Sequence, residues 1–439
     1  MPLFNRQNGI YLERRKATKD MAIVPITLPD RVFIPMTQGD CPASVPCVEP
    51  GDKVTVGQLI GRAKDKRAVP VHSSVSGTVV SVAPRMSQYG YSDLHIEIET
   101  DGKQSVLPQL APPVVDGRQS FLDAVRNSGL VGLGSFGVPT AEKLAAEGLS
   151  LLIVNAAECE PYLACDYRNT LAFPKDAVLG AADIMKWLGI GRCIIAVGAD
   201  KQDAAALLKK ESADLEGIEI TMLSAIYPSG EERTLIRELT GKEMQPGVSP
   251  ADLGIAVLNV STVIRLRQYL VTGMPLVSRS LTVSGACVAS PMNVEAPVGT
   301  LFSDVLAFCK ADLSNAGKLT VSGPMTGAAL PSADYPVIKT NNAALLFPTQ
   351  HAARDKETAC INCGQCVRAC PAGLVPVVLM KAWQKKSAEA LLKHRIFACV
   401  SCGSCSYVCP ARRQLSFELS MAAAWTQQQL NNTPEECHE

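Results

Sequence analysis

Eight of the chain's 16 cysteines lie in two short runs near its C-terminal end. The first run, CINCGQCVRACP, begins at Cys360, and the second, CVSCGSCSYVCP, begins at Cys399. Both runs have the spacing C-x2-C-x2-C-x3-C-P. A secreted disulfide scaffold would be shorter and would spread its cysteines along the chain. The regular spacing therefore indicates a metal site.

The same spacing favours two [4Fe–4S] clusters. Three cysteines two residues apart can hold one cluster, while the fourth lies on the following helix and reaches the other cluster. The predicted ligand sets are Cys360, Cys363, Cys366 and Cys409 for one cluster and Cys399, Cys402, Cys405 and Cys370 for the other. Two structural zinc sites are the alternative, but the third cysteine of each run does not suit tetrahedral coordination. Two clusters in one small domain predict electron transfer.

The composition predicts a soluble protein of several domains. A length of 439 residues corresponds to about three domains, and 47% apolar residues are enough for buried cores. Basic and acidic residues each number 42, so no net charge favours nucleic acid or an anionic membrane as a partner. No stretch is long and apolar enough to span a membrane, and the N-terminus carries charges where a signal peptide needs an apolar core. We therefore expect a cytoplasmic protein.

Residues 1–105 are predicted to form a barrel-sandwich domain. Short alternating runs between positions 24 and 99 are separated by glycine and proline turns, as in VPCVEPGDKVTVGQLIG and VPVHSSVSGTVVSVAP. This layout resembles a biotinyl or lipoyl carrier domain, whose modified lysine would correspond to Lys64 or Lys66. Neither lysine has the flanking methionine or Asp-Ala context of a modified carrier. We therefore expect an unmodified domain, with modification at these lysines as the alternative.

Residues 120–275 are predicted to form an α/β domain. Strand-like runs such as LSLLIVNA and RCIIAVG alternate with helix-like stretches, which predicts a parallel sheet covered by helices on both faces. A ligand is expected at the carboxyl ends of such strands. Glycines and polar residues stand at these ends: Gly132, Gly134, Gly137, Asn155, Glu158, Glu160, Glu231 and Glu232. The glycines could cradle a phosphate or form a close-packed turn, and the last two glutamates could be a solvated first helical turn.

Two further domains complete the predicted architecture. Short β-runs such as LTVSG, KLTVSG and YPVIKT predict a small β-rich domain over residues 276–348. The cysteine runs, the helical stretches between them and a closing helix predict a helical ferredoxin-like domain with two clusters over 352–428. A tail over 429–439 follows. The predicted fold class is thus multidomain, with α/β and β parts.

Along nearly its whole length, the chain resembles the RnfC-like family, named after the RnfC component of the Rnf-type electron-transport complex. The matching stretches occur in the family's order: GDKVTVGQLIG, HSSVSGTV, GLGSFGVPT, NAAECEPYLACDYR, YPSGEERTLI, LTGKEMQPGVSPADLGIAVLNVST, GPMTGAALPS and the two cysteine runs. The central part is similar to the flavin- and NADH-binding subunit of respiratory complex I. The resemblance implies an FMN cofactor and makes residues 276–348 a β-grasp domain. The FMN contacts that it implies are Gly132, Gly134, Gly137, Lys143, Asn155, Glu158, Glu231 and Asn259.

The function that the resemblance implies is electron transfer by an iron-sulfur flavoprotein. NADH would deliver a hydride to FMN, and single electrons would pass to the two clusters and on to a partner protein. No side chain need act as an acid or base. The family's loop reads Gly-x-Gly-Gly-Ala-Gly-Phe-Pro, whereas this chain has Ser135, Phe136 and Val138. Side chains at 135 and 136 could obstruct a flavin, so a flavin-free relay that does not oxidise NADH is the alternative.

The expected partners are other electron-transfer proteins or subunits of a membrane complex, with no transmembrane segment in the chain itself and no nucleic acid. A position at the inner face of the cell membrane is one expected location. The interior of a bacterial microcompartment is the other, because similar short proteins serve there as soluble electron donors or cofactor reductases.

Overall fold

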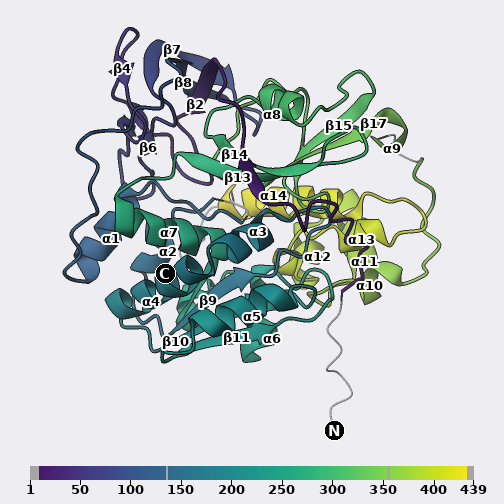
Figure 1. Cartoon of the computed structure of the whole chain (residues 1–439). Helices are drawn as coiled ribbons and strands as arrows, with labels where there is room; N and C mark the ends of the chain where they lie inside the picture. The colour runs from purple at the N-terminus through teal and green to yellow at the C-terminus, as the bar shows by residue number, and fades with distance from the viewer. Residues whose placement is uncertain (1–8, 135–136, 353–355, 433–439) are drawn as a thin grey trace. The chain divides into compact units, whose positions relative to one another are not determined.

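The structure is a computed structural model that describes residues 9–134, 137–352 and 356–432 (Figure 1). Contacts between residues divide the chain into two units. The larger unit comprises Arg14–Leu223 and Pro250–Ala352, and the smaller one comprises Ser224–Ser249, the cysteine-rich end and the residues up to Glu13. The segment 224–249 therefore belongs to the unit of the cysteine runs, although it lies in the middle of the chain.

The first part of the larger unit is the predicted barrel sandwich. One sheet has the strand order β2-β8-β7-β4 and the other has the order β3-β5-β6. The strands are β2 (Arg31–Pro35), β3 (Val45–Pro46), β4 (Lys53–Val54), β5 (Leu59–Arg62), β6 (Val71–His72), β7 (Gly77–Met86) and β8 (Ser92–Thr100). Alternate residues such as Val32, Ile34, Ile96 and Ile98 are buried between the sheets, as a sandwich requires. Lys64 and Lys66 are exposed in the turn between β5 and β6.

The second part is the predicted α/β domain, and its sheet is parallel throughout. The strand order is β11-β10-β9-β12, for β9 (Leu151–Ala156), β10 (Arg192–Val197), β11 (Ile218–Met222) and β12 (Ile255–Asn259). The helices are α1 (Arg118–Asn127), α2 (Thr140–Ala145), α3 (Cys165–Ala172), α4 (Pro174–Leu188), α5 (Gln202–Glu211) and α7 (Val260–Thr272). Strand residues such as Leu152, Val154 and Ile195 form one core with helix residues such as Ile184 and Val263. Burial on both faces explains why these strands read as continuous apolar runs.

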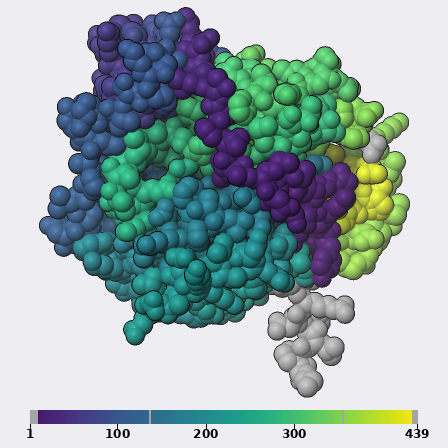
Figure 2. Space-filling view, viewed as in Figure 1, coloured from purple at the N-terminus to yellow at the C-terminus, as the bar shows by residue number. Residues whose placement is uncertain are grey.

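The third part is a six-stranded mixed sheet with the order β1-β14-β13-β17-β15-β16. Its elements are β13 (Ser278–Ser284), β14 (Met292–Pro297), α8 (Phe302–Phe308), β15 (Ala316–Val321), β16 (Ala328–Leu330) and β17 (Ala343–Pro348). Its edge strand β1 (Ile23–Pro25) comes from the N-terminal part of the chain and pairs with β14 in parallel. Figure 2 shows this purple segment on the surface where the teal and green parts of the unit meet. Lys16, in the same N-terminal segment, donates to the Glu158 and Leu163 carbonyls, so the segment connects the β-rich part to the α/β part.

The smaller unit is helical. Its helices are α6 (Glu232–Thr240), α10 (Gln365–Arg368), α11 (Pro376–Gln384), α12 (Ala388–Lys393), α13 (Ser404–Tyr407) and α14 (Leu415–Asn432). Leu379, Leu391, Ile396 and Leu419 form its core. The helices between the cysteine runs and the closing helix agree with the prediction. Within the described part of the chain, no helix has the length and apolarity needed to cross a membrane.

Candidate functional site

The smaller unit brings the eight cysteines of the two runs together around two cavities. The first cavity has a volume of about 220 Å³ and is lined by Cys360, Cys363, Cys366 and Cys409. The second is narrower, at about 20 Å³, and is lined by Cys370, Cys399, Cys402 and Cys405. Each cavity therefore receives three cysteines from one run and the last cysteine of the other. We call them the first cage and the second cage.

The two cages are built alike because their sequences repeat. Gly364 and Gly403 have φ values of 71° and 80° and stand at the N-termini of α10 and α13. This left-handed conformation favours glycine, so the backbone can turn sharply within each run. The third cysteine of each run lies on the short helix that follows. Four thiols around one cavity suit a cubane [4Fe–4S] cluster, because each of its four irons takes one cysteine sulfur in addition to the inorganic sulfides.

Burial affects the charge state of the thiols in both cages. It raises the pKa of Cys402 to about 11, opposed by a hydrogen bond to Ser404. Burial also raises the pKa values of Cys370 and Cys366. Thiolates are the species that bind iron, so the loss of their protons must be offset by the charge of the bound metal. Among the described residues, no three His, Cys, Asp or Glu side chains lie close enough together to hold one metal ion between them.

The glycine loop of the α/β domain closes on itself at the base of α2. Val131 and Pro139 form a bridge, and the Gly132 N–H donates to the Val138 carbonyl over 2.9 Å. Gly137 has a φ of 74° and lies against Gly39 and Thr340, which leave no room for a side chain. The prediction about Ser135 and Phe136 concerns residues outside the described part of the chain.

Two other elements hold this loop in place at Leu133. Its N–H donates to the Thr262 hydroxyl on α7 over 3.0 Å, and its carbonyl accepts from the buried Arg279 guanidinium over 3.0 Å. The Arg279 Nε also donates to the Asn341 carbonyl over 2.8 Å. Arg279 is a supporting residue that sequence reasoning missed, because its connection to Leu133 spans 146 positions of the chain.

Asn155 and Asn259 stand opposite each other at the carboxyl ends of the neighbouring strands β9 and β12. Asn259 is also the N-cap of α7, since its Oδ1 accepts from the Ser261 N–H over 2.8 Å. A Cβ placed on Gly134 would lie 3.0 Å from the Asn259 Nδ2. The glycine loop, two strand ends and a helix N-terminus therefore converge, and such a convergence can bind an anionic group. A side chain at 134 would require the loop or Asn259 to move by a few tenths of an ångström.

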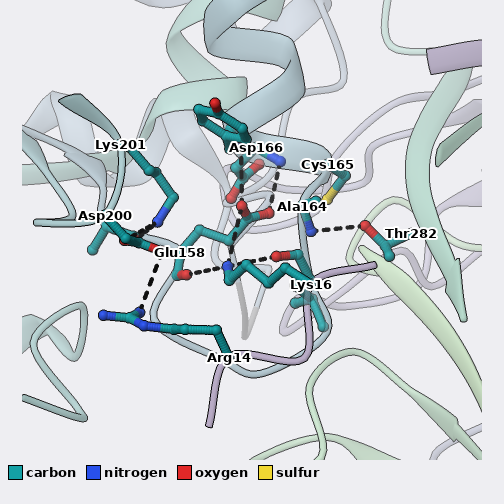
Figure 3. A network of polar contacts seen from close by, with 12 residues as sticks. Arg14, Lys16, Glu158, Ala164, Cys165, Asp166, Asp200, Lys201 and Thr282 are labelled. Carbon is teal, nitrogen blue, oxygen red and sulfur yellow. Dashed lines mark hydrogen bonds and ion pairs between the residues drawn. The ribbon is translucent and has the colours of Figure 1, made fainter. Parts of the chain in front are cut away.

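Glu158, two residues after the end of β9, lies in a network of charged side chains (Figure 3). Its carboxylate accepts from the Asp166 N–H over 2.8 Å and from the Tyr167 N–H over 3.3 Å, at the start of α3. Lys16 Nζ lies 3.7 Å from the Glu158 Oε2 and donates to the Glu158 carbonyl over 2.8 Å. Burial raises the pKa of Glu158, and the positive charge of Lys16 opposes this. The carboxylate is therefore held by the chain's own donors.

Three other residues that the resemblance implies as FMN contacts also interact with backbone groups of the chain. The Asn155 Oδ1 accepts from the Ala157 N–H over 3.1 Å. Lys143, on α2, points its Nζ towards the Val257 carbonyl at 3.4 Å. Glu231 lies in the smaller unit, where it caps α6 by accepting from the Thr234 N–H over 2.9 Å. Glu231 is therefore the N-cap of α6 and stands just before its first turn.

Three regions of the chain match known protein families. Residues 4–103 match the RnfC barrel sandwich hybrid domain, and residues 125–268 match the Nuo51 FMN-binding domain. Residues 359–412 match a 4Fe–4S dicluster domain. The matches follow the structural parts of the chain, and they confirm the expected barrel sandwich, FMN-binding domain and ferredoxin-type domain.

Relatives match over most of the chain. The C component of the Na⁺-translocating ferredoxin:NAD⁺ oxidoreductase complex of Acetobacterium woodii is 34% identical, across 86% of this chain and 87% of the relative. The C component of the proton-translocating ferredoxin:NAD⁺ oxidoreductase complex of Clostridium ljungdahlii is 35% identical, across 86% and 84%. The corresponding component of an ion-translocating oxidoreductase complex of Yersinia pseudotuberculosis is 34% identical across 90% of this chain but 58% of its own length.

A solved structure shares the fold. The crystal structure of NAD⁺-reducing [NiFe]-hydrogenase in the air-oxidised state superposes with a TM-score of 0.52, covering 72% of this chain and 67% of that one. The sequence identity is 22%, so this likeness concerns the fold alone.

Proposed function

Since this chain belongs to the RnfC family of the Rnf-type electron-transport complexes, we propose that it transfers electrons between NADH and a partner protein through FMN and two [4Fe–4S] clusters. It is an electron-transfer protein with an FMN-binding domain and a 4Fe–4S dicluster domain. The use of NADH, the number of clusters and the identity of the partner are the parts of the function that we propose.

The observation that carries the proposal is the sorting of the eight cysteines into two cages. Each cage has four thiols, which is the ligand number of one [4Fe–4S] cluster. Three cysteines of each cage come from a C-x2-C-x2-C run, as in two-cluster ferredoxins. We assign the first cluster to Cys360, Cys363, Cys366 and Cys409, and the second to Cys370, Cys399, Cys402 and Cys405.

The α/β domain is proposed to bind FMN at the carboxyl ends of β9 and β12. The N-terminus of α7, which lies beside the glycine loop, would suit a phosphate. The proposed contacts are those of the larger unit, Gly132, Gly134, Gly137, Lys143, Asn155, Glu158 and Asn259. Glu231, the remaining residue that the resemblance implies, lies in the smaller unit and caps α6. When bound, FMN would convert between the two-electron chemistry of a hydride and the one-electron chemistry of clusters.

The protein residues of this site act by positioning. Asn259 orients the start of α7 and contacts the Asp166 carboxylate, while Arg279 and Thr262 hold the glycine loop. Glu158 and Lys16 fix the segment that follows β9. No proton transfer by a side chain is required for the proposed function.

The names of the relatives place those proteins in ion-translocating complexes, which supports a peripheral position on a membrane complex with other Rnf-type subunits as partners. We propose this location at the inner face of the cell membrane. The same names give no support to a location inside a microcompartment. The direction of electron flow in such a complex would depend on the potentials of the two end partners.

The deciding experiment first measures iron, sulfide and flavin per chain in anaerobically purified protein. The protein is then titrated with NADH while its visible absorption spectrum is recorded. We expect eight irons and one FMN per chain, and bleaching of both flavin and clusters by NADH. Fewer than eight irons in fully folded protein would contradict the two-cluster assignment.

A flavin-free relay is the second candidate, because Ser135 and Phe136 depart from the family's loop and because the Glu158 carboxylate is already held by α3 and Lys16. The same experiment separates the two candidates. Eight irons without flavin after FMN is added, and without any response to NADH, would favour the relay. Intact mass would test the remaining alternative, modification at Lys64 or Lys66.

A further inference from the structure

Helix α6 and the turn before it are attached to the second cage by three side chains. The Tyr227 hydroxyl donates to the Cys402 carbonyl over 2.8 Å. Arg233 Nη1 donates to the Phe397 carbonyl over 3.1 Å, and Arg237 Nη1 donates to the Pro371 carbonyl over 2.9 Å. Tyr227 is 3% exposed, so this attachment is not a loose surface contact.

All three carbonyls belong to cysteines of the second cage or to residues close to them. Pro371 follows Cys370, and Phe397 comes two residues before Cys399. Within the described part of the chain, the side-chain hydrogen bonds of Arg233 and Arg237 reach no backbone group of the first cage. The helix therefore contacts one cage selectively.

The two arginines bring positive charge to this cage. Both side chains are half-buried, and no carboxylate among the described residues lies within ion-pair distance of either guanidinium. Of the acidic residues on the same helix, Glu231 accepts from the backbone at Arg233 and Thr234, and Glu238 accepts from the Ser224 N–H. The carbonyl that Arg233 contacts lies only two residues before Cys399, so its positive charge stands beside the second cage.

A fixed positive charge near a cluster changes its reduction potential. Reduction adds one electron to the cluster, so the reduced form carries one more negative charge than the oxidised form. A nearby cation stabilises the reduced form more, particularly where water is partly excluded, and the potential rises.

We propose that Arg233 and Arg237 are redox-tuning residues, which raise the reduction potential of the cluster held by Cys370, Cys399, Cys402 and Cys405 and leave the other cluster nearly unchanged. This inference rests on the proposed function, because it requires both clusters. Helix α6 would thus influence electron transfer through the charge that it brings to one cluster. The clusters in the two similar cages would then have different reduction potentials.

The test is an anaerobic redox titration of the full chain with dithionite as the reductant, followed by electron paramagnetic resonance. In Arg233→Gln we expect one of the two cluster signals to need a lower potential, with the ratio of reduced to oxidised cluster falling about tenfold at a fixed potential. This change corresponds to about 59 mV for a one-electron couple. Arg233→Lys keeps the charge and should shift the same signal much less.

Arg368→Gln is the matched variant for the first cage, because Arg368 Nη2 points to the Cys363 carbonyl at 3.4 Å. It should shift the signal that Arg233→Gln leaves unchanged. Arg237→Gln provides a second variant for the second cage and should move the same signal as Arg233→Gln. If Arg233→Gln lost its iron, Arg237→Gln would decide the question.

The outcomes separate this inference from the proposed function. A wild-type protein without eight irons would remove the proposed function and this inference together. A full iron content with unchanged potentials in Arg233→Gln and Arg237→Gln would overturn the inference alone. Equal shifts of both signals would also overturn it, since the effect would then not be confined to one cage.

Discussion

The Asn259 amide donates to the Asp166 carboxylate over 2.6 Å while the same side chain caps helix α7. Asp166 is 5% exposed and accepts a second hydrogen bond from the Ser261 hydroxyl over 2.6 Å. One asparagine therefore joins the end of β12, the start of α7 and the start of α3. The backbone around the proposed flavin site is therefore held in place by side-chain hydrogen bonds.

Replacing Asn259 with alanine is expected to destabilise the larger unit by about 1–2 kcal/mol. The change removes a helix cap and leaves a buried carboxylate with one donor fewer. The thermal unfolding midpoint in the absence of added FMN measures this effect. Ser261→Ala is the matched variant, because it removes the other donor to Asp166 but keeps the Asn259 cap. An Asn259→Ala protein as stable as the wild type would show that the cap contributes little.

Replacing Gly134 with alanine is expected to lower the flavin content at least severalfold. The new Cβ would lie 3.0 Å from the Asn259 Nδ2, so either the loop or the asparagine must shift. FMN per chain after reconstitution is the measurement. Gly191→Ala is the control, because its Cβ would meet no atom within 4 Å. Equal flavin content in both variants would contradict a flavin site at this loop.

Single cysteine replacements are expected to sort by cage and not by run. Cys366→Ala and Cys409→Ala should lose the same cluster signal, although they lie in different runs, because both line the first cage. Cys370→Ala should lose the other signal. Iron analysis and electron paramagnetic resonance provide the readout, with Cys47→Ala as a control at an exposed thiol. Loss of the same signal in Cys409→Ala and Cys405→Ala would disprove the crossed assignment.

Lys339 is expected to make stability depend on pH in the alkaline range. Burial lowers its pKa from 10.5 to about 8, and its Nζ donates to the carbonyls of Pro70 and Gly129. The titratable groups that interact with its charge are His72 and Cys41. Between pH 8 and 10.5 the unfolded chain retains the lysine proton and the folded chain releases it, so stability rises with pH.

The size of this effect is of the order of 3 kcal/mol over the full window. Because thiols also titrate in this range, the informative quantity is the difference between wild type and Lys339→Met in chemical unfolding at several pH values. The wild type should gain stability relative to the variant as pH rises from 8 to 10.5. If the free energies of unfolding of the two proteins changed with pH in parallel, the pKa of Lys339 would not be lowered in the folded state.

The cysteine spacing and the alternation of strands and helices were readable from the sequence because they are local. A C-x2-C-x2-C run places three thiols on one loop wherever that loop lies, and an apolar run between turns forms a buried strand in almost any α/β domain. Gly134 and Asn155 could be named as candidate site residues because each stands at the end of a predicted element. Asn259 could be named because it lies in a stretch that resembles the RnfC-like family.

The remaining features depend on which distant segments meet, and only packing decides that. Arg279 reaches Leu133 across 146 positions, and Lys16 meets Glu158 across 142. The carboxylate of Glu158 turns to the N–H groups of α3, a direction that no local pattern specifies. The segment 224–249 has the sequence of an α/β unit, yet it folds with the cysteine runs because Tyr227, Arg233 and Arg237 find carbonyl partners there. Local spacing thus determined the chemistry of the ligands, and tertiary contacts determined which charges surround them.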